Sequence, residues 1–320
     1  MKERKALSHL ARTRYPSYAR LIMQDLHPGS SWKLLEFEFL RFIFLYLEDF
    51  VNKEERNLVI NLPPSFFKTT LIVLMAVFLY LRDGARILIL VRTDEARMRL
   101  MANVMMVLTL PRTKILFPEM KSRRVGKSVV GRNGARITIQ LFKTLPEETL
   151  QDFILVDDPE PFIDPEHVDA DAEKYISQVM RPTSEANSVL MLSARVGKRD
   201  ASKMMVEWFG ATHLKFGAVF LDDEKLTHKA GVSLQQKKLR MLCPEMMTWE
   251  RFTKTRRGLD MWDVCYRYLS HSVESPWTPR CSCALWAIMM ATFGEIMTST
   301  QKHNVPEEIY DSYTAARKEE

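Results

Sequence analysis

A lysine and a threonine, Lys68 and Thr69, stand side by side at the end of a short loop. The loop follows the apolar stretch 57–62 and precedes the apolar run 71–81, a pattern that predicts a strand, a turn and a helix. A lysine in this position can neutralise the terminal phosphates of a nucleotide, while a neighbouring hydroxyl holds Mg²⁺. The stretch therefore predicts a phosphate-binding loop. Its residues would be Pro64, Ser65, Phe66, Phe67, Lys68, Thr69 and Thr70.

This loop departs from the usual glycine-rich pattern G-x-x-x-x-G-K-[ST]. Pro63 lies near the position of the first glycine, and Phe67 takes the position of the second. A side chain at Phe67 is expected to crowd the phosphates or to shift the loop. A plain strand, turn and helix with an exposed lysine is the alternative interpretation of this stretch taken alone.

Two adjacent carboxylates, Asp157 and Asp158, follow the hydrophobic stretch 153–156. In parallel sheets, ligands bind beyond the carboxyl ends of the strands. An acid at the tip of a buried strand can reach Mg²⁺, directly or through water, and a second carboxylate can orient an attacking water. The alternative is a strand that simply ends in a turn before Pro159.

The elements that position these residues alternate between strands and helices. Continuous apolar runs flanked by charges predict strands buried on both faces, and apolar stripes at helical spacing predict helices. The pattern predicts an α/β domain with a mostly parallel sheet. Besides the loop and its flanks, the expected strands are 86–92, 136–141, 152–156 and 188–192, and the expected helices are 32–51, 94–108 and 165–180.

Composition limits the class of protein. The 320 residues are 46% hydrophobic, which is enough for a folded core, and the net charge of +6 favours an anionic partner. Residues 1–20 hold no apolar segment typical of a signal peptide, and the runs 71–81 and 283–293 are too short to span a bilayer. We therefore expect a soluble intracellular protein with no membrane partner. The four cysteines, read as reduced thiols, are Cys243, Cys265, Cys281 and Cys283.

A basic segment runs from Lys114 to Arg136 and holds seven lysines and arginines against the single acid Glu119. Its glycines suggest exposed loops, so the segment could bind a phosphate backbone without reading sequence. A solvated charged loop is the alternative. The predicted DNA contacts are Lys121, Arg123, Arg124, Lys127 and Arg132, and a second, weaker cluster is Lys237, Lys238 and Arg240.

Several of these stretches together resemble the ATPase domain of tailed-phage terminase large subunits. In that family the loop reads I-N-x-P-P-x-x-x-K-[ST], and here Asn61-Leu62-Pro63-Pro64 precedes Lys68-Thr69. The family's acidic strand ends in D-D-P or D-E, which 154–159 resembles, and the stretch 190–195 resembles its coupling strand. The double proline is the most specific element, and the resemblance covers roughly residues 27–275.

The resemblance implies a P-loop NTPase fold of the RecA/ASCE type, with helices flanking the sheet and a small helical C-terminal extension. It implies that Lys68 binds the β- and γ-phosphates of ATP and that Thr69 and Asp157 serve Mg²⁺. Asp158 would stand where the family often has its catalytic glutamate, with Glu160 as a second candidate. Ser193 would couple the state of the γ-phosphate to movement. An arginine acting in cis or in trans is also implied, and the sequence leaves three candidates open: Arg123, Arg124 and Arg132.

The implied organisation is an N-terminal helical segment over 1–55, a P-loop ATPase core over 56–225, a linker or helical subdomain over 226–275 and a tail over 276–320. Terminase large subunits usually continue into a nuclease domain, whose chemistry needs several carboxylates on separate strands. The residues after Glu274 are too few for such a core, so we expect no nuclease activity from this chain.

The implied function is an ATP-driven motor subunit that packages double-stranded viral DNA in the cytoplasm of the infected host cell. Its implied partners are DNA, a portal protein, a small terminase subunit, a separate nuclease and further copies of itself in a ring. One alternative is a nucleotide-dead scaffold that binds DNA or a portal-like partner, which Phe67 and the missing nuclease favour. The other is a helicase-like DNA-repair ATPase, which should show D-E-x-[DH] and a second RecA-like domain.

Overall fold

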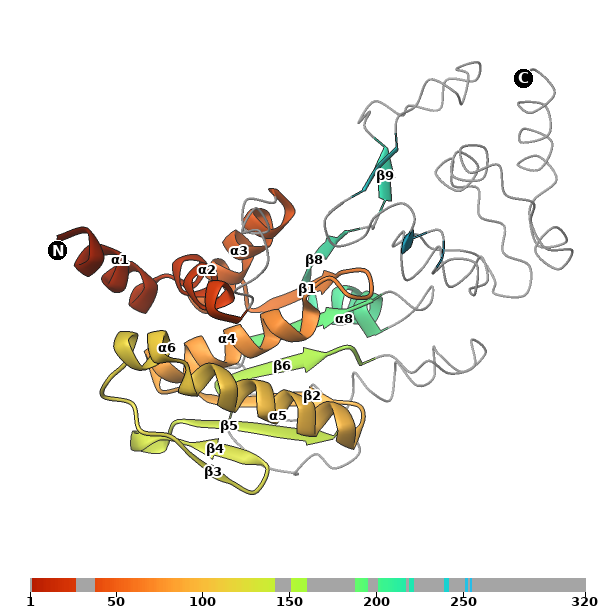
Figure 1. Ribbon diagram of the computed structural model, residues 1–320. Coiled ribbons are helices and arrows are strands. Elements are labelled where there is room, and N and C mark those ends of the chain that lie inside the picture. The colour runs from red at the N-terminus through yellow and green to blue at the C-terminus, as the bar shows by residue number, and fades with distance from the viewer. Residues whose placement is uncertain are drawn as a thin grey trace, which may run out of the picture.

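The computed structural model describes residues 2–26, 38–141, 151–159, 188–194, 201–216, 219–221, 239–241, 251–252 and 254. Within these ranges the chain forms an eight-stranded sheet with helices on both faces (Figure 1). The expected helix over 165–180, the four cysteines and the expected C-terminal extension lie outside the described residues. No helix among the described residues has the length and apolar character needed to cross a membrane.

The strands of the main sheet follow the order β3-β4-β5-β2-β6-β7-β1-β8. All pairs from β5 to β8 in this order are parallel, whereas β3 and β4 form an antiparallel hairpin on β5. The bounds are β1 (Asn57–Asn61), β2 (Arg86–Val91), β3 (Arg123–Val125), β4 (Ser128–Val130), β5 (Arg136–Leu141), β6 (Phe153–Asp157), β7 (Ser188–Ser193) and β8 (Thr212–Lys215). A separate antiparallel pair consists of β9 (Val219–Leu221) and β10 (Leu239–Met241).

This topology confirms the predicted fold class of a mostly parallel α/β sheet flanked by helices. The loop strand β1 and the acidic strand β6 are separated by β7 alone, so the carboxyl ends of the three strands lie next to one another. In Figure 1 the parallel strands end on the same side of the sheet. The four strands expected beyond the loop form at their expected places, with ends that differ by at most one residue.

The parallel strands are apolar throughout because both faces of the sheet are covered. On β1, Leu58 and Ile60 belong to a large core, and Val59 belongs to a second core on the other face. The same alternation places Leu155 in the large core and Ile154 in the second. Alternate residues of each strand therefore face opposite sides of the sheet and pack against the helices on each side.

Helices from the N-terminal half of the chain cover the large core, and one later helix covers the second core (Figure 1). The helix α4 begins at Lys68, as the sequence predicted, and ends at Asp83, followed by Gly84, whose φ of 64° suits a glycine. The helix α5 begins after Thr93, whose hydroxyl accepts a hydrogen bond from the Ala96 N–H at 3.2 Å. The bounds are α1 (Lys2–Thr13), α2 (Tyr15–Leu26), α3 (Glu38–Val51), α4 (Lys68–Asp83), α5 (Asp94–Thr109), α6 (Pro111–Leu116) and α8 (Ala201–Phe209).

The basic segment differs from the expected exposed loops, because part of it is the β3–β4 hairpin at the edge of the sheet. Gly126 supplies the positive φ of 57° in the turn, and the Ile139 N–H binds the carbonyl oxygen of Lys127 at 3.0 Å. A short 3₁₀ turn, Arg132–Gly134, leads into β5. The basic side chains are exposed as predicted, but three of them, Arg123, Arg124 and Lys127, stand on a hairpin attached to the sheet.

Candidate active site

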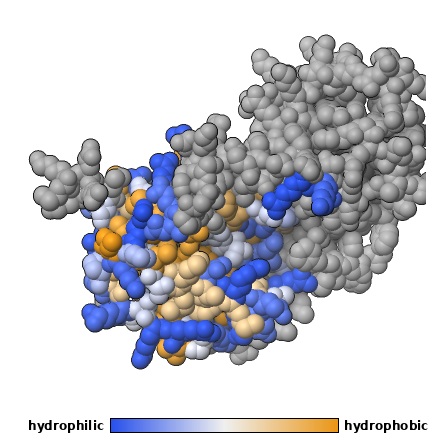
Figure 2. All heavy atoms as spheres, viewed as in Figure 1, coloured by the Kyte–Doolittle hydropathy of each residue, from blue (hydrophilic) through white to orange (hydrophobic). Residues whose placement is uncertain are grey.

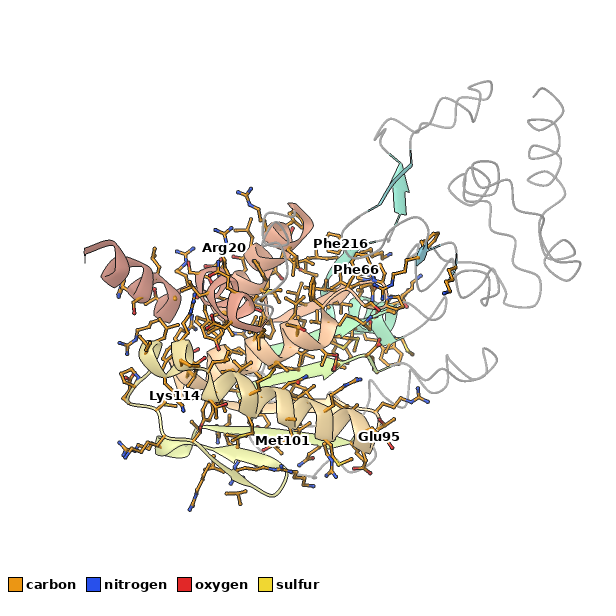
Figure 3. All side chains as sticks on the ribbon, in the orientation of Figure 1. Arg20, Phe66, Glu95, Met101, Lys114 and Phe216 are labelled. Carbon is orange, nitrogen blue, oxygen red and sulfur yellow. The ribbon has the colours of Figure 1, made fainter. Side chains whose placement is uncertain are left out.

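The loop between β1 and α4 adopts the backbone conformation that glycine usually provides. Ser65 has a φ of 69° and Phe67 a φ of 60°, both in the left-handed region that side chains disfavour. A turn closes between the Phe66 N–H and the Pro63 carbonyl oxygen at 3.3 Å. Phe66 (Figure 3) is only 1% exposed and packs in the large core, and Phe67 packs partly buried against that core. Aromatic packing therefore holds a loop that has no glycine.

The amine of Lys68 lies beneath this loop. Its Nζ donates to the carbonyl oxygens of Leu62 and Pro63, each at 3.3 Å, and lies 3.9 Å from Oδ2 of Asp158. Burial lowers the pKa of Lys68, while the charges of Asp158 and Asp157 act to raise it. The amine is therefore positioned between the loop and the acidic strand, as the sequence predicted for a phosphate-binding lysine.

The hydroxyl of Thr69 reaches the acidic strand directly. It donates a hydrogen bond of 2.9 Å to Oδ2 of Asp157, the last residue of β6. The first turn of α4 therefore passes over the end of β7 to meet β6. The structure brings together Lys68, Thr69 and the two carboxylates, which the sequence had predicted from two motifs far apart in the chain.

Asp157 is 7% exposed, and burial raises its pKa to about 6. The Thr69 hydrogen bond lowers this pKa, the charge of Asp158 raises it, and the charges of Lys68 and Arg99 lower it. The second carboxylate oxygen, Oδ1, has no hydrogen-bond partner among the described residues. A threonine hydroxyl beside a carboxylate with an unpartnered buried oxygen is a donor set of hard oxygens that fits Mg²⁺.

Asp158 is held against the end of β7. Its own N–H binds the carbonyl oxygen of Leu192 at 2.9 Å, and its Oδ1 accepts the Ala194 N–H at 3.0 Å. The backbone of Asp158 is left-handed, with a φ of 46°, and its side chain is 44% exposed. This carboxylate therefore has one oxygen fixed to the backbone and keeps access to solvent beside Lys68.

The remaining predicted site residues take different places. Ser193 is fully buried beneath the loop, where its hydroxyl accepts a hydrogen bond from Asn61 Nδ2 at 2.8 Å and lies 2.7 Å from the hydroxyl of Ser202. Its contact with a nucleotide stays a prediction. Pro64, Ser65 and Thr70 lie in the loop and the first turn of α4 with their side chains at least partly exposed, whereas Glu160 lies outside the described residues.

The three predicted arginines do not meet the carboxylates. Arg123 and Arg124 stand on β3, four strand positions from β6, a separation of about 19 Å at the usual spacing of strands. Arg132 lies in the turn after β4. Sequence reasoning missed Arg99 on α5, whose charge acts on Asp157. Only the strand order points to Arg99: β2, which leads into α5, pairs with β6, and β6 carries Asp157.

A pocket of about 520 Å³ lies between α5 and the turn of the β3–β4 hairpin. Its basic side chains are Arg97, which pairs with Asp94 at 2.7 Å, Arg124, whose Nε donates to the Gly126 carbonyl oxygen at 3.3 Å, and Lys127. Met98 and Met101 supply the apolar lining, and Figure 3 labels Met101 on α5. Figure 2 shows moderately hydrophobic residues in the part of the surface that α5 crosses, bordered by hydrophilic ones. Lys121 and Arg132 are exposed outside this pocket.

No protein-family model matches the chain, and no curated protein matches it. Among solved structures, the chain is similar to the large terminase of bacteriophage HK97, with 13% identity over 57% of this chain and 39% of that chain, at a TM-score of 0.42. It is also similar to a mutant ATPase domain of the large terminase of Thermus phage P74-26, with 14% identity over 68% of this chain and 90% of that chain, at a TM-score of 0.44. The chain thus spans well under half the length of the HK97 protein.

Proposed function

We propose that this chain is the ATPase of a viral DNA-packaging motor, a terminase large subunit that hydrolyses ATP to move double-stranded DNA. The observation that carries the proposal is the hydrogen bond between Thr69 and Asp157 beside the buried amine of Lys68. This bond joins the end of the loop between β1 and α4 to Asp157 at the tip of β6, which lies two strand positions from β1 in the sheet. Amine, hydroxyl and carboxylate in this arrangement are what a site for a nucleoside triphosphate with Mg²⁺ requires.

In the proposed site, Lys68 binds the β- and γ-phosphates. Its present bonds to the Leu62 and Pro63 carbonyl oxygens are exchanged for bonds to phosphate oxygens, in which the acceptor as well as the donor is charged. Thr69 and Asp157 hold Mg²⁺, which when bound neutralises charge on the phosphate oxygens. Pro64, Ser65, Phe66, Phe67 and Thr70 complete the loop around the phosphates.

Asp158 is the proposed group that orients the attacking water. Hydrolysis is an in-line attack of water on the γ-phosphoryl group, so the reaction needs a carboxylate near that phosphate and little covalent help. The Ala194 N–H fixes one oxygen of Asp158, which leaves the oxygen facing Lys68 for the water. Glu160 is the second candidate for this role. Because the hairpin arginines lie far from the carboxylates, an arginine among Arg123, Arg124 and Arg132 would act in trans on the site of a neighbouring copy.

DNA is proposed to bind at the hairpin edge of the sheet through Lys121, Arg123, Arg124, Lys127 and Arg132, all of which are exposed. Their charges contact the phosphate backbone and read no sequence, which suits a motor that accepts any DNA. Assembly into a ring in the host cytoplasm, with a portal protein, a small subunit and a separate nuclease, belongs to the same proposal.

The test is ATP hydrolysis by the purified chain, with and without linear double-stranded DNA, beside Asp157→Ala. A matched control is Ser188→Ala, because Ser188 is also buried in the sheet and its hydroxyl has no partner among the described residues. We expect DNA-stimulated turnover in the wild type and the control, and none in Asp157→Ala. Absence of both turnover and ATP binding in the wild type would favour the nucleotide-dead scaffold, with the hairpin as its main functional surface.

A further inference from the structure

A buried polar cluster lies directly beneath the loop and joins four elements of the fold. Asn61 ends β1, Ser193 ends β7, Ser202 lies in the first turn of α8, and His213 lies in β8. Asn61 Nδ2 donates to the hydroxyls of Ser193 at 2.8 Å and Ser202 at 2.9 Å, and the two hydroxyls lie 2.7 Å apart. The Nε2 of His213 lies 2.5 Å from Oδ1 of Asn61. Asn61, Ser193 and Ser202 have no exposed surface.

The direction of the contact with His213 follows from the chemistry of the amide. An amide oxygen only accepts, so Oδ1 of Asn61 is the acceptor and His213 donates from Nε2, while Nδ2 lies within hydrogen-bond distance of both serine hydroxyls. Each serine oxygen accepts from Asn61, and one hydroxyl donates to the other. Asn61 is therefore the centre of the cluster, because its side-chain amide contacts each of the other three side chains.

The cluster touches the proposed nucleotide site through the backbone on both sides of Ser193. The carbonyl oxygen of Ser193 accepts the Leu62 N–H at 2.9 Å, at the start of the loop. The next residue, Ala194, donates its N–H to the carboxylate of Asp158. A shift of the loop or of Asp158 therefore acts directly on the end of β7.

On its other side the cluster includes a residue of the first turn of α8. Ala201, Met204 and Met205 of this helix pack into the second core, and Ser202 faces Asn61 from the same turn. Near the far end of the helix, Trp208 is 43% exposed. A movement transmitted through Ser202 would thus reach a tryptophan at the surface.

We propose that Asn61 and Ser202 are positioning residues of the ATPase site, and that through them the nucleotide state of the loop is transmitted to α8. The inference rests on the proposed function. Its physical basis is that Asn61, Ser193 and Ser202 are fully buried: no water replaces a partner lost among them, so these three side chains move together with the loop and Asp158 when nucleotide binds. The cluster thereby assigns α8 as the element that responds to ATP.

The experiment uses the full chain labelled with 5-fluorotryptophan and observed by ¹⁹F NMR. The Trp208 signal is assigned among the six tryptophans by Trp208→Phe. A non-hydrolysable ATP analogue with Mg²⁺ is added to saturation, and its affinity is measured in parallel by calorimetry. We expect the Trp208 signal of the wild type to shift on binding. We expect Ser202→Ala to bind the analogue with at most a few-fold loss of affinity and to lose most of the shift, while Ser188→Ala keeps it.

A second pair of variants covers the case in which Ser202→Ala does not fold. His213 is only partly buried, so its replacement disturbs packing less. In His213→Gln the amide can still donate to Asn61, and we expect the Trp208 shift to persist, whereas His213→Ala reduces it. An analogue that binds the wild type without moving Trp208, or variants that all keep the full shift, would overturn the inference alone. Failure of the analogue to bind the wild type at all would instead overturn the proposed function and the inference with it.

Discussion

The hydroxyl of Thr69 donates a 2.9 Å hydrogen bond to Oδ2 of Asp157, which lies 88 residues further along the chain. The bond connects the first turn of α4 to the tip of β6, with Lys68 buried beside it. It depends on the strand order, because β7 alone separates the strands that carry the two motifs.

Replacement of Thr69 should separate the role of its hydroxyl from that of its bulk. Thr69→Ala removes the donor to Asp157, and we expect a roughly tenfold to hundredfold loss of ATP turnover, the usual effect of removing a group that orients a metal ligand. Thr69→Ser keeps the hydroxyl and should retain most of the activity. Steady-state hydrolysis at several Mg²⁺ concentrations measures both variants. Equal activity in the two would show that the hydroxyl plays no part.

Asp157 should make stability depend on pH. Its pKa is raised to about 6 in the folded chain, mainly by burial, so the folded state binds this proton more tightly than the unfolded state, where the carboxyl has its ordinary value of 3.8. The resulting stabilisation is fully present below pH 3.8 and is lost as the pH rises through about 6. Relative to Asp157→Asn, the wild type should lose up to about 3 kcal/mol of unfolding free energy over this window.

Urea unfolding of the wild type and Asp157→Asn between pH 3.5 and 8, with EDTA present, measures this difference. Because the Thr69 hydrogen bond lowers the pKa of Asp157, Thr69→Ala should move the transition to a higher pH. Curves for the wild type and Asp157→Asn that run parallel across the whole range would contradict the assignment of a raised pKa.

The sheet and the meeting of its two motifs could be predicted because local patterns decide them. Strands buried on both faces are continuous apolar runs, as in 87–91 and 153–156, and parallel strands bring their carboxyl ends to one edge. Lys68, Thr69 and Asp157 could therefore be placed together before their distances were known.

Other features depend on strand order or on packing, which one sequence does not express. The strands of the hairpin are only three residues long, and β3 is exposed throughout, so they carry too little alternation of apolar and polar residues to be distinguished from a loop. Ser202 and His213 meet Asn61 from 141 and 152 residues away, and neither is marked by a motif. The left-handed backbone of Phe67 was hidden because aromatic packing replaces the expected glycine.

Truncation of Phe66 should cost far more stability than truncation of Phe67. Phe66 is 1% exposed in the core, so Phe66→Ala should destabilise the chain by about 3 to 5 kcal/mol. Phe67 is only partly buried and has a φ of 60°, so Phe67→Gly relieves backbone strain of about 1 kcal/mol while it loses some packing. The net change in stability for Phe67→Gly should stay within about 1 kcal/mol.

The same glycine opens space before Lys68, so we expect Phe67→Gly to bind ATP more tightly than the wild type. Thermal unfolding of Phe66→Ala and Phe67→Gly tests the two stability changes. ATP titration of Phe67→Gly beside the wild type tests the change in affinity. Tighter binding by the wild type than by Phe67→Gly would mean that the aromatic ring supports the nucleotide rather than crowding it.

The hairpin cations should account for the salt dependence of DNA binding. Arg124 and Lys127 are exposed at the hairpin turn, and each phosphate contact contributes about 0.9 to the slope of log affinity against log salt concentration. The double variant Arg124→Ala/Lys127→Ala should therefore lower this slope by up to about 1.8 and weaken binding of all sequences alike. Fluorescence anisotropy with two unrelated duplexes measures it. Lys203→Ala, on α8 at the other face of the sheet, is the control and should leave the slope unchanged.

Gly131 should be required for the close approach between the hairpin and α4. A Cβ atom at this position would lie 2.9 Å from Cζ of Tyr80 and closer still to its hydroxyl, yet the backbone φ of −109° is open to any residue. Gly131→Ala should therefore destabilise the chain by about 1 to 3 kcal/mol through overpacking alone. At Gly126 the added atom meets nothing within 4 Å, but the φ of 57° disfavours a side chain, so Gly126→Ala should cost about 1 kcal/mol through the backbone.

Tyr80→Phe distinguishes these two causes, because it removes the nearest atom to the new Cβ of Gly131→Ala and none near Gly126. In chemical denaturation, the double variant Tyr80→Phe/Gly131→Ala should recover part of the stability lost by Gly131→Ala, while Tyr80→Phe should add nothing to Gly126→Ala. If the effects of Tyr80→Phe and Gly131→Ala on stability were strictly additive, the small size of Gly131 would serve something other than contact with Tyr80. Recovery would establish that α4, which begins at Lys68, packs directly on the base of the hairpin proposed to bind DNA.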